Sequence, residues 1–210
     1  MISSEGETVQ LLTGVDPNAP KAKGNVEVWF TDLQKMMRLT VKDVFKASIA
    51  DYAASPRAKW VLSWPGQVVL NVSQLYWTNE VEALLNAKGL EGLREYEKQL
   101  NAQMTDIVAL VRGKLSKMGR TTLGALTTID VHARDVITEM IEARVSRTSE
   151  FLWLAQLRYA WQHHPDEGYN RYGDDPMNLV AKIVNASQLY GYEYLGNSSR
   201  LVITPLTDRW

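Results

Sequence analysis

The run NVEVWFTDLQKMMRLTVKDVFKASIADY, residues 25–52, sets the fold class. Its hydrophobic side chains recur at intervals of three and four residues, and no proline or glycine interrupts the run before Pro56. Asn25 is of a residue type that accepts hydrogen bonds from the first free amides of a helix. The pattern predicts one amphipathic helix, about 40 Å long at about 1.5 Å per residue. A helix of this length favours an elongated architecture.

The segments on either side of this run extend the helical pattern. Residues 1–24 are rich in glycine and proline and are expected to form an incoming arm. Turns are expected around Pro56 and at 63–66. The later segments with helical spacing are 67–87, 90–115, 121–145 and 149–162. Successive helices without intervening strands predict a helical bundle, which we place at residues 25–176.

The C-terminal part of the chain shows a different pattern. A polar segment at 163–176 marks a boundary, and residues 179–186 fit either a strand or a short helix. Tyr190, Tyr192 and Tyr194 alternate as they would on one face of a strand, and helices around 151–161 offer a surface for that face. We therefore predict a β-hairpin at 189–204, within a hairpin region at 177–204. The predicted fold class is mainly α: an elongated helical bundle with a C-terminal β-hairpin.

Composition excludes several classes of function. The chain has 210 residues, 45% of them hydrophobic, with 23 basic and 24 acidic residues and a net charge of −1. No basic run is long enough to predict binding of nucleic acid or of a membrane surface. The chain has no cysteine, which excludes disulfides and thiolate zinc sites. Neither a signal peptide nor a membrane span is recognisable, so the chain is expected to be soluble.

Few residues suggest catalysis. A P-loop requires a hydroxyl residue after Gly-Lys, but Leu115 follows Gly113 and Lys114, which we place inside a helix. His132 and Asp135 would share a helix face and would suit an acid–base pair or half of a metal site. An inter-helix hydrogen bond or ion pair is the favoured interpretation, because no third ligand or nucleophile accompanies them. We therefore predict no catalytic residue and no metal site.

Three further features are interpreted as structural. His163 and His164 are expected to be solvated loop residues. Asp174 and Asp175 precede Pro176 and are expected to form a turn that their side chains satisfy. Packing between helices, rather than ligand stacking, is expected of most of the tryptophans: Trp29, Trp60, Trp64, Trp77, Trp153 and Trp161.

A resemblance to a known family rests first on the C-terminal residues. Residues 190–197, YGYEYLGN, followed by 200–209, RLVITPLTDR, resemble the signature with which dynein heavy chains pass from the linker into the first AAA+ module. Upstream segments that also resemble this family cover nearly the whole chain: 23–29, 64–70, 74–78, 129–136 and 156–159.

The resemblance implies a place in the motor. In that family the linker is a curved helical rod that lies across a hexameric AAA+ ring and straightens during the power stroke. This chain would be its ring-proximal part, with 205–210 beginning the first module. The amino-acid sequences of 64–67 and 131–135 are more similar to those of axonemal than of cytoplasmic heavy chains. This similarity implies a location in a cilium or flagellum, with the cytoplasm as the alternative. The expected partners are the ring of the same heavy chain and other dynein subunits; microtubules would be reached only through the intact motor.

The resemblance also implies where nucleotide binds. The adenine would lie near Leu201, Val202, Pro205 and Leu206 only in the intact motor, which also holds ATP and magnesium. No cofactor is expected in the isolated chain, and it is not expected to be an enzyme. Trp210 stands where the family more often has cysteine. Two alternatives stay open: an independent helical scaffold, and an enzyme that uses His132 and Asp135.

Overall fold

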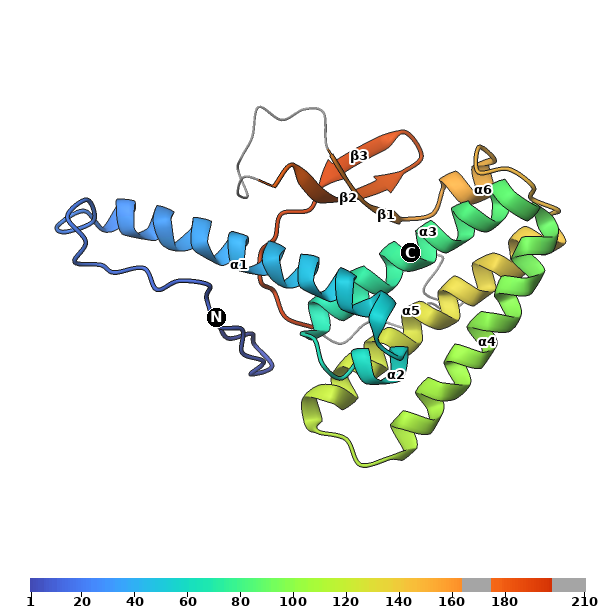
Figure 1. The fold of residues 1–210 in the computed structure, drawn as a ribbon, viewed down its shortest axis with the longest axis horizontal. Helices are drawn as coiled ribbons and strands as arrows, with labels where there is room; N and C mark the ends of the chain where they lie inside the picture. Colours follow the sequence, from blue (N-terminus) through green and yellow to red (C-terminus); the bar gives the residue numbers. More distant parts are fainter. Residues whose placement is uncertain (164–174, 198–210) are drawn as a thin grey trace, which may run out of the picture.

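The computed structural model describes residues 1–163 and 175–197, and it is mainly helical with a small antiparallel sheet (Figure 1). This confirms the predicted fold class. The helices are α1 (Val26–Ala54), α2 (Arg57–Trp60), α3 (Gly66–Lys88), α4 (Leu90–Arg112), α5 (Lys117–Glu142) and α6 (Phe151–Leu154). The strands are β1 (Arg158–His163), β2 (Met177–Ile183) and β3 (Ala186–Leu189).

The helix boundaries follow from local sequence. The amide of Val28 donates to the Asn25 side chain at the start of α1, and Pro56 follows its end. Gly89 ends α3 with a φ of +56°, which a residue without Cβ adopts at low cost, and the same residue precedes α4. The turns expected at Pro56 and 63–66 flank the short helix α2, which the sequence pattern did not indicate.

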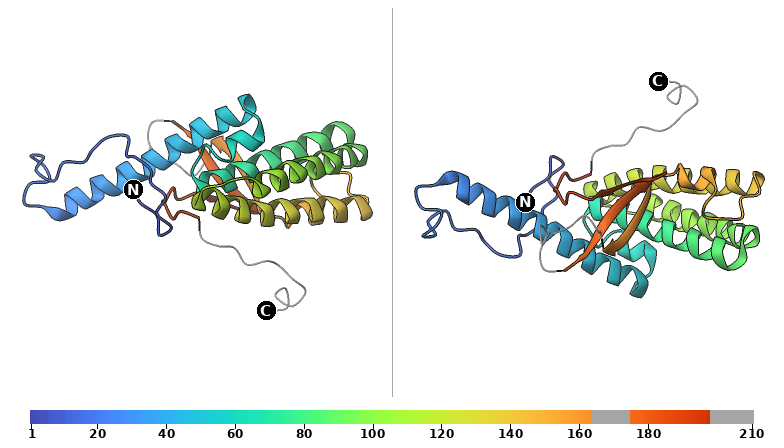
Figure 2. Two further views of the ribbon diagram at one scale, coloured as in Figure 1. Left: turned by 90° about the horizontal axis from the view of Figure 1, so that it is seen from below. Right: turned by 90° about the horizontal axis from the view of Figure 1, so that it is seen from above.

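Helices α3, α4 and α5 form an antiparallel bundle, and α1 crosses it at one end (Figures 1 and 2). The N-terminal half of α1 extends beyond the bundle, and the arm runs back along it. In this arm, Trp29 Nε1 donates to the carbonyl of Val15, and the amide of Leu12 donates to Thr40 Oγ1. The arm therefore lies against α1 through specific hydrogen bonds.

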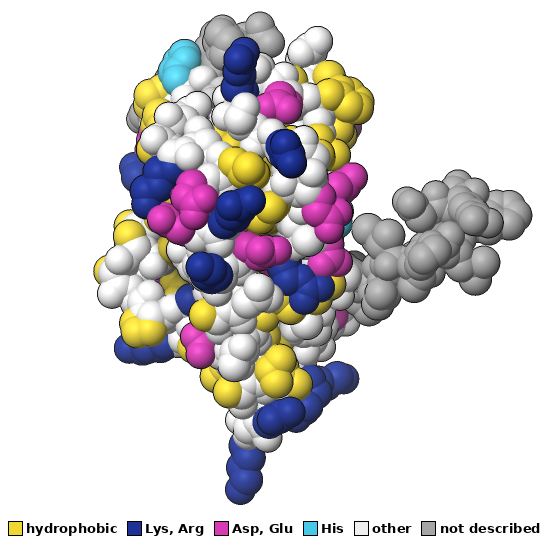
Figure 3. Space-filling model, turned by 90° about the vertical axis from the view of Figure 1, so that its right-hand side faces the viewer, with side chains coloured by type: hydrophobic (Ala, Val, Ile, Leu, Met, Phe, Trp, Pro, Cys, Tyr) yellow, Lys and Arg dark blue, Asp and Glu magenta, His cyan; other side chains and the backbone are white. Residues whose placement is uncertain are grey.

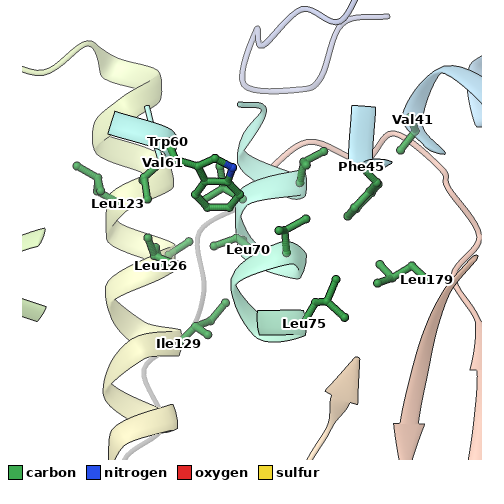
Figure 4. Packing of buried hydrophobic residues seen from close by; sticks show 14 of the residues in the cluster. Val41, Phe45, Trp60, Val61, Leu70, Leu75, Leu123, Leu126, Ile129 and Leu179 are labelled. Atoms are coloured by element: carbon green, nitrogen blue, oxygen red, sulfur yellow. The ribbon is translucent and has the colours of Figure 1, made fainter. Parts of the chain in front are cut away.

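The hydrophobic core has two clusters. In the first, α5 residues Leu123, Leu126 and Ile129 face Trp60 and Leu70 (Figure 4). Val41 and Phe45 of α1 and Leu179 of β2 lie beyond α3 in the same view. The second, which we call the distal cluster, occupies the other end of the bundle and comprises Trp77, Val81, Leu85, Leu93, Tyr96, Leu100, Ala133, Val136, Ile137, Met140, Val145 and Trp153. Burial of each large side chain contributes about 1.5–3 kcal/mol.

The tryptophans support packing rather than ligand stacking. Trp60 and Trp153 are fully buried, and the rings of Trp77 and Trp153 lie 5.0 Å apart. Trp60 Nε1 donates to the carbonyl of Ser48, so its polar atom is satisfied inside the core.

The sheet has the order β1-β2-β3, and both pairs are antiparallel. Strand β1 packs against α3, where the Tyr159 amide donates to Thr78 Oγ1. Strand β2 brings Leu179 and Val180 into the core. The sheet thus covers one side of the bundle (Figure 2).

Several predicted element boundaries were wrong. The helix expected at 149–162 ends at Leu154, and its second half is strand β1, because residues 158–163 pair along their length with β2. The hairpin expected at 189–204 occurs earlier, between β2 and β3, and the undecided segment 179–186 belongs largely to β2. Residues 190–197 form no strand, and 198–204 lie outside the described residues. Helix 90–115 ends at Arg112, since Gly113 caps it, and α5 begins at Lys117, four residues before expected, because Ser116 caps it.

None of the helices in the described part of the chain is both long and apolar enough to cross a membrane.

Candidate functional site: the clasp between the bundle and the C-terminal segment

Three distant segments meet at the start of α3, in a site that we call the clasp. It consists of the side chains of Glu7, Gln67, Tyr190 and Tyr194 and the backbone of residues 193–196. The segments are the N-terminal arm, the first turn of α3 and the chain that follows β3. The clasp joins parts of the chain that are up to 187 residues apart.

Gln67 is the centre of the clasp. Its Nε2 donates to Tyr190 Oη at 2.6 Å and to the carbonyl of Glu193 at 2.7 Å. Its Oε1 accepts from the amides of Leu195 at 2.8 Å and Gly196 at 3.1 Å. A glutamine amide has two donor hydrogens and two acceptor lone pairs, so every position is used. Because Gln67 is only 5% exposed, these bonds replace its contact with water and fix the path of the C-terminal segment.

Glu7 caps α3 from a different segment. Pro65 precedes the helix and provides no side-chain cap, which leaves the amide of Gly66 free. Glu7 Oε1 accepts from this amide at 2.9 Å, and Oε2 accepts from Tyr194 Oη at 2.7 Å. A carboxylate is favoured at the positive end of a helix. Burial, followed by the hydrogen bond to Glu7, raises the pKa of the Tyr194 hydroxyl well above its usual value.

Two glycines allow the three segments to approach one another. A Cβ on Gly66 would lie 2.9 Å from the Asn197 side chain. Gly196 has a φ of +73°, and a Cβ there would lie 2.4 Å from Ser3 Cβ. Both distances are shorter than normal van der Waals contact, so the clasp requires glycine at these positions.

The tyrosines anchor the C-terminal segment on α1 and β2. Phe45 contacts the rings of Tyr190 and Tyr192 edge-on, with centroids 5.2 and 5.9 Å apart. Tyr192 is fully buried with a φ of +50°, and its hydroxyl accepts from the amide of Leu179 at 2.7 Å. The predicted strand at this place is therefore wrong, because residues 190–197 are irregular. The three tyrosines contact α1, α3 and the arm, and Tyr159 and Trp161 of the expected surface pack on the same core cluster.

His132 and Asp135, the alternative acid–base pair, both lie on α5, and no hydrogen bond between them is found among the described residues. His132 is exposed at the edge of a cavity in the bundle, whereas the carboxylate of Asp135 accepts from its neighbour Arg134. The interhelical ion pair is made by Asp130, whose carboxylate accepts from Arg57 Nη2 at 2.8 and 2.9 Å. Burial raises the pKa of the Asp130 carboxyl, and the Arg57 guanidinium opposes this rise. This pair connects α2 with α5 inside the bundle.

The remaining candidates are structural where they are described. Gly113 and Lys114 lie at the end of α4 and in the exposed loop after it, not inside a helix as predicted. Asp175 forms the expected turn, since its Oδ1 accepts from the amide of Met177 at 3.0 Å. His163 ends β1. Candidates outside the described residues are His164, Asp174, Leu201, Val202, Pro205 and Leu206.

Within residues 1–163 and 175–197, no group of three or more histidine or acidic side chains is placed to hold a metal ion. The clasp was not predicted as a site from sequence. Its only signal was the resemblance of 64–70 and 190–197 to one family, and the structure brings those two segments into contact.

Comparisons with known proteins identify the relatives. No family model matches the chain. Over 209 residues and its full length, the chain is 51% identical to dynein axonemal heavy chain 12 of Mus musculus, 47% to dynein axonemal heavy chain 3 of Homo sapiens and 44% to dynein axonemal heavy chain 1 of Homo sapiens. It spans 6%, 5% and 4% of the length of these relatives. The chain is therefore homologous, from end to end, to a segment of the axonemal dynein heavy chains.

Proposed function

We propose that this chain is the ring-proximal part of the mechanical linker of an axonemal dynein heavy chain. In this role it transmits ATP-driven rearrangements of the AAA+ ring to the rest of the lever, in the axoneme of a cilium or flagellum. The observation that carries the proposal is the clasp. Gln67 uses all four hydrogen-bonding positions to hold the bundle to the segment that, by resemblance, leads into the first AAA+ module.

The bundle supports a lever role because long helices that pack along their length are expected to resist bending. Helices α3, α4 and α5 have 23, 23 and 26 residues and pack side by side. Close-packed apolar cores have low compressibility and transmit displacement. The ion pair between Arg57 and Asp130 adds a directional contact within this core. A displacement of the clasp would therefore move the bundle as one body.

In this proposal, the AAA+ modules carry out the chemistry and this chain transmits the movement. ATP hydrolysis belongs to the AAA+ modules, which would hold ATP and magnesium, and this chain supplies no catalytic residue. In the intact motor, residues 201–206 would lie near the adenine. Partners would be the ring of the same heavy chain and other dynein subunits, and microtubules would be reached through the intact motor. We assign residues 1–24 to the incoming arm, 25–176 to the linker bundle, 177–204 to the junction and 205–210 to the start of the first module.

The test is to loosen the clasp in an intact motor. A heavy-chain motor carrying Gln67→Ala should keep its microtubule-stimulated ATPase rate while its microtubule gliding velocity falls about twofold or more, because chemistry continues but displacement is lost at the junction. Gln99→Ala is the matched control, since Gln99 is exposed on α4 and far from the clasp. It should leave both rates unchanged.

Two results would contradict the proposal. If ATPase rate and velocity fall in equal proportion, Gln67 acts on the catalytic cycle rather than on transmission. If neither changes, the chain is better explained as an independent helical scaffold. Magnesium-dependent ATP turnover by the purified 210-residue chain would contradict the assignment of catalysis to the other modules.

A further inference from the structure

The loop between α4 and α5 forms a basic end of the bundle. Residues 107–129 contain no aspartate or glutamate but include Arg112, Lys114, Lys117 and Arg120. All four are exposed, and none forms an ion pair with a described carboxylate. Figure 3 shows Lys and Arg side chains gathered at the lower end of the molecule, where this loop lies in Figure 1. We call these four residues the basic tip.

A groove of mixed polar and apolar lining lies beside the basic tip. It is open to solvent and runs between the turn after α2 and the start of α5, with Glu7, Ser116 and Thr122 as its polar side. Its lining includes Leu62, Trp64, Leu115 and Met118, with Lys114 at the boundary with the tip. Leu62 is 45% exposed, although a Cβ on Gly119 across the groove would lie 3.4 Å from its Cδ2. Leu62 therefore lies close to the first turn of α5 but keeps part of its apolar surface exposed.

We propose that the groove and the basic tip together bind an acidic protein segment with an apolar anchor residue. The anchor would occupy the groove between Leu62 and Met118, and carboxylates on either side of it would pair with Lys114, Lys117 and Arg120. The positive N-terminal end of α5 lies at the same place and adds to the attraction for carboxylates. Four charges at one tip are too few for a nucleic-acid footprint, whereas the apolar side of the groove, with Leu62, Trp64 and Met118, suits a peptide anchor.

The groove also adjoins the clasp. Glu7 contributes to its lining while its two carboxylate oxygens hold Gly66 and Tyr194. A segment bound in the groove would therefore contact the arm at the residue that caps α3. Binding would exclude water from the hydrogen bonds of Glu7 and so strengthen them.

The test is a binding titration with the 210-residue chain. The probe is a short fluorescein-labelled peptide of glutamates with a central Phe-Leu pair, followed by fluorescence anisotropy. Saturable binding that weakens as ionic strength rises is expected. The double variant Lys114→Glu, Lys117→Glu should weaken binding about tenfold or more. Leu62→Ser should weaken it about fivefold, because the anchor loses apolar contact.

Matched controls separate this site from general charge attraction. Lys98→Glu changes an exposed lysine on α4 away from the tip, and Val108→Ser changes an apolar residue that is 44% exposed outside the groove. Both should change affinity less than about twofold. The proposal is wrong if the peptide does not bind, if Lys98→Glu weakens binding as much as the tip variant, or if a peptide with Ser-Ser in place of Phe-Leu binds equally well. Equal binding of single-stranded DNA would assign the tip to polyanions in general.

Discussion

The distal cluster and the clasp lie at opposite ends of the same bundle and are stabilised by different interactions. In the distal cluster, apolar surface is buried by side chains of three helices: Trp77 of α3, Met140 of α5 and Trp153 of α6. At the clasp, Gln67 and Glu7 form hydrogen bonds whose partners are backbone amides, a carbonyl and tyrosine hydroxyls. Apolar burial has no preferred direction, whereas a hydrogen bond weakens steeply when its angle changes. One end therefore stabilises the fold, and the other specifies the position of one segment.

The largest effect is expected from the distal cluster. Trp153→Ala should lower the free energy of unfolding by about 4 kcal/mol, because it removes a fully buried indole and leaves a cavity next to Trp77. Urea denaturation followed by circular dichroism measures this change. Val108→Ala, at a position that is 44% exposed, should change it by less than about 0.5 kcal/mol. A loss below about 1 kcal/mol for Trp153→Ala would show that this end is not the stabilising one.

The clasp should respond with a smaller and more local change. Gln67→Ala leaves the amides of Leu195 and Gly196 without their partner, and we expect a loss of about 2 kcal/mol in the stability of this site. Hydrogen exchange should accelerate at 190–196 while the distal cluster keeps its protection. Gln67→Glu sharpens the comparison, since its oxygens can accept from those amides but cannot donate to the carbonyl of Glu193. Equal acceleration at both ends would argue against separate roles.

Alkaline pH tests the hydroxyl of Tyr52, a partly buried residue that packs against the first core cluster. Burial raises its pKa to about 12, and the charge of Arg57 opposes the rise. The unfolded value is about 10, so the folded state holds this proton more tightly. The contribution of the protonated Tyr52 hydroxyl to the free energy of unfolding is complete below about pH 10. It is lost as pH rises to about 12, and the free energy of unfolding then falls by up to about 2 kcal/mol. Tyr52→Phe should make this decline shallower in urea denaturation at each pH. An unchanged slope would exclude Tyr52 as its source.

The smallest change is expected from Glu7→Gln. The amide still offers one acceptor to Gly66 and one donor to the Tyr194 hydroxyl, so only the charge is lost. We expect about 1 kcal/mol of destabilisation, and it should diminish at high salt. Denaturation in low and high salt measures it, with Glu139→Gln on the exposed face of α5 as control. A salt-independent loss would show that shape rather than charge matters here.

The helices were predictable from sequence because their signals are local. Three- and four-residue spacing gave α1, α3, α4 and α5, and residues of capping type, such as Asn25 and Gly89, were visible at their ends. The sheet was harder. Strand β1 is short and partly apolar, and such a run has no spacing that separates it from a helix. Residues 158–163 form a strand because they pair with β2, which lies on the other side of the boundary expected at 163–176.

The clasp was not predictable from any local pattern. A glutamine near the start of a helix normally faces water, and nothing around Gln67 indicates partners 123 to 129 residues away. Gly196 suggests a turn, but its closeness to Ser3 depends on where the arm runs. Contacts at such separations depend on the packing of all the helices between them.

The hydrogen bond between Tyr194 and Glu7 links the two ends of the described chain, so the clasp should carry a force applied between these ends. Residues 1 and 197 lie on two of the three segments that the clasp joins, so a pull between them is expected to act on the clasp before it reaches the helical core. Several hydrogen bonds around Gln67 and Glu7 then bear the load together, and they should break as a group. In an optical trap we expect a first rupture at low force with a small gain in length, followed by a separate rupture when the bundle unfolds.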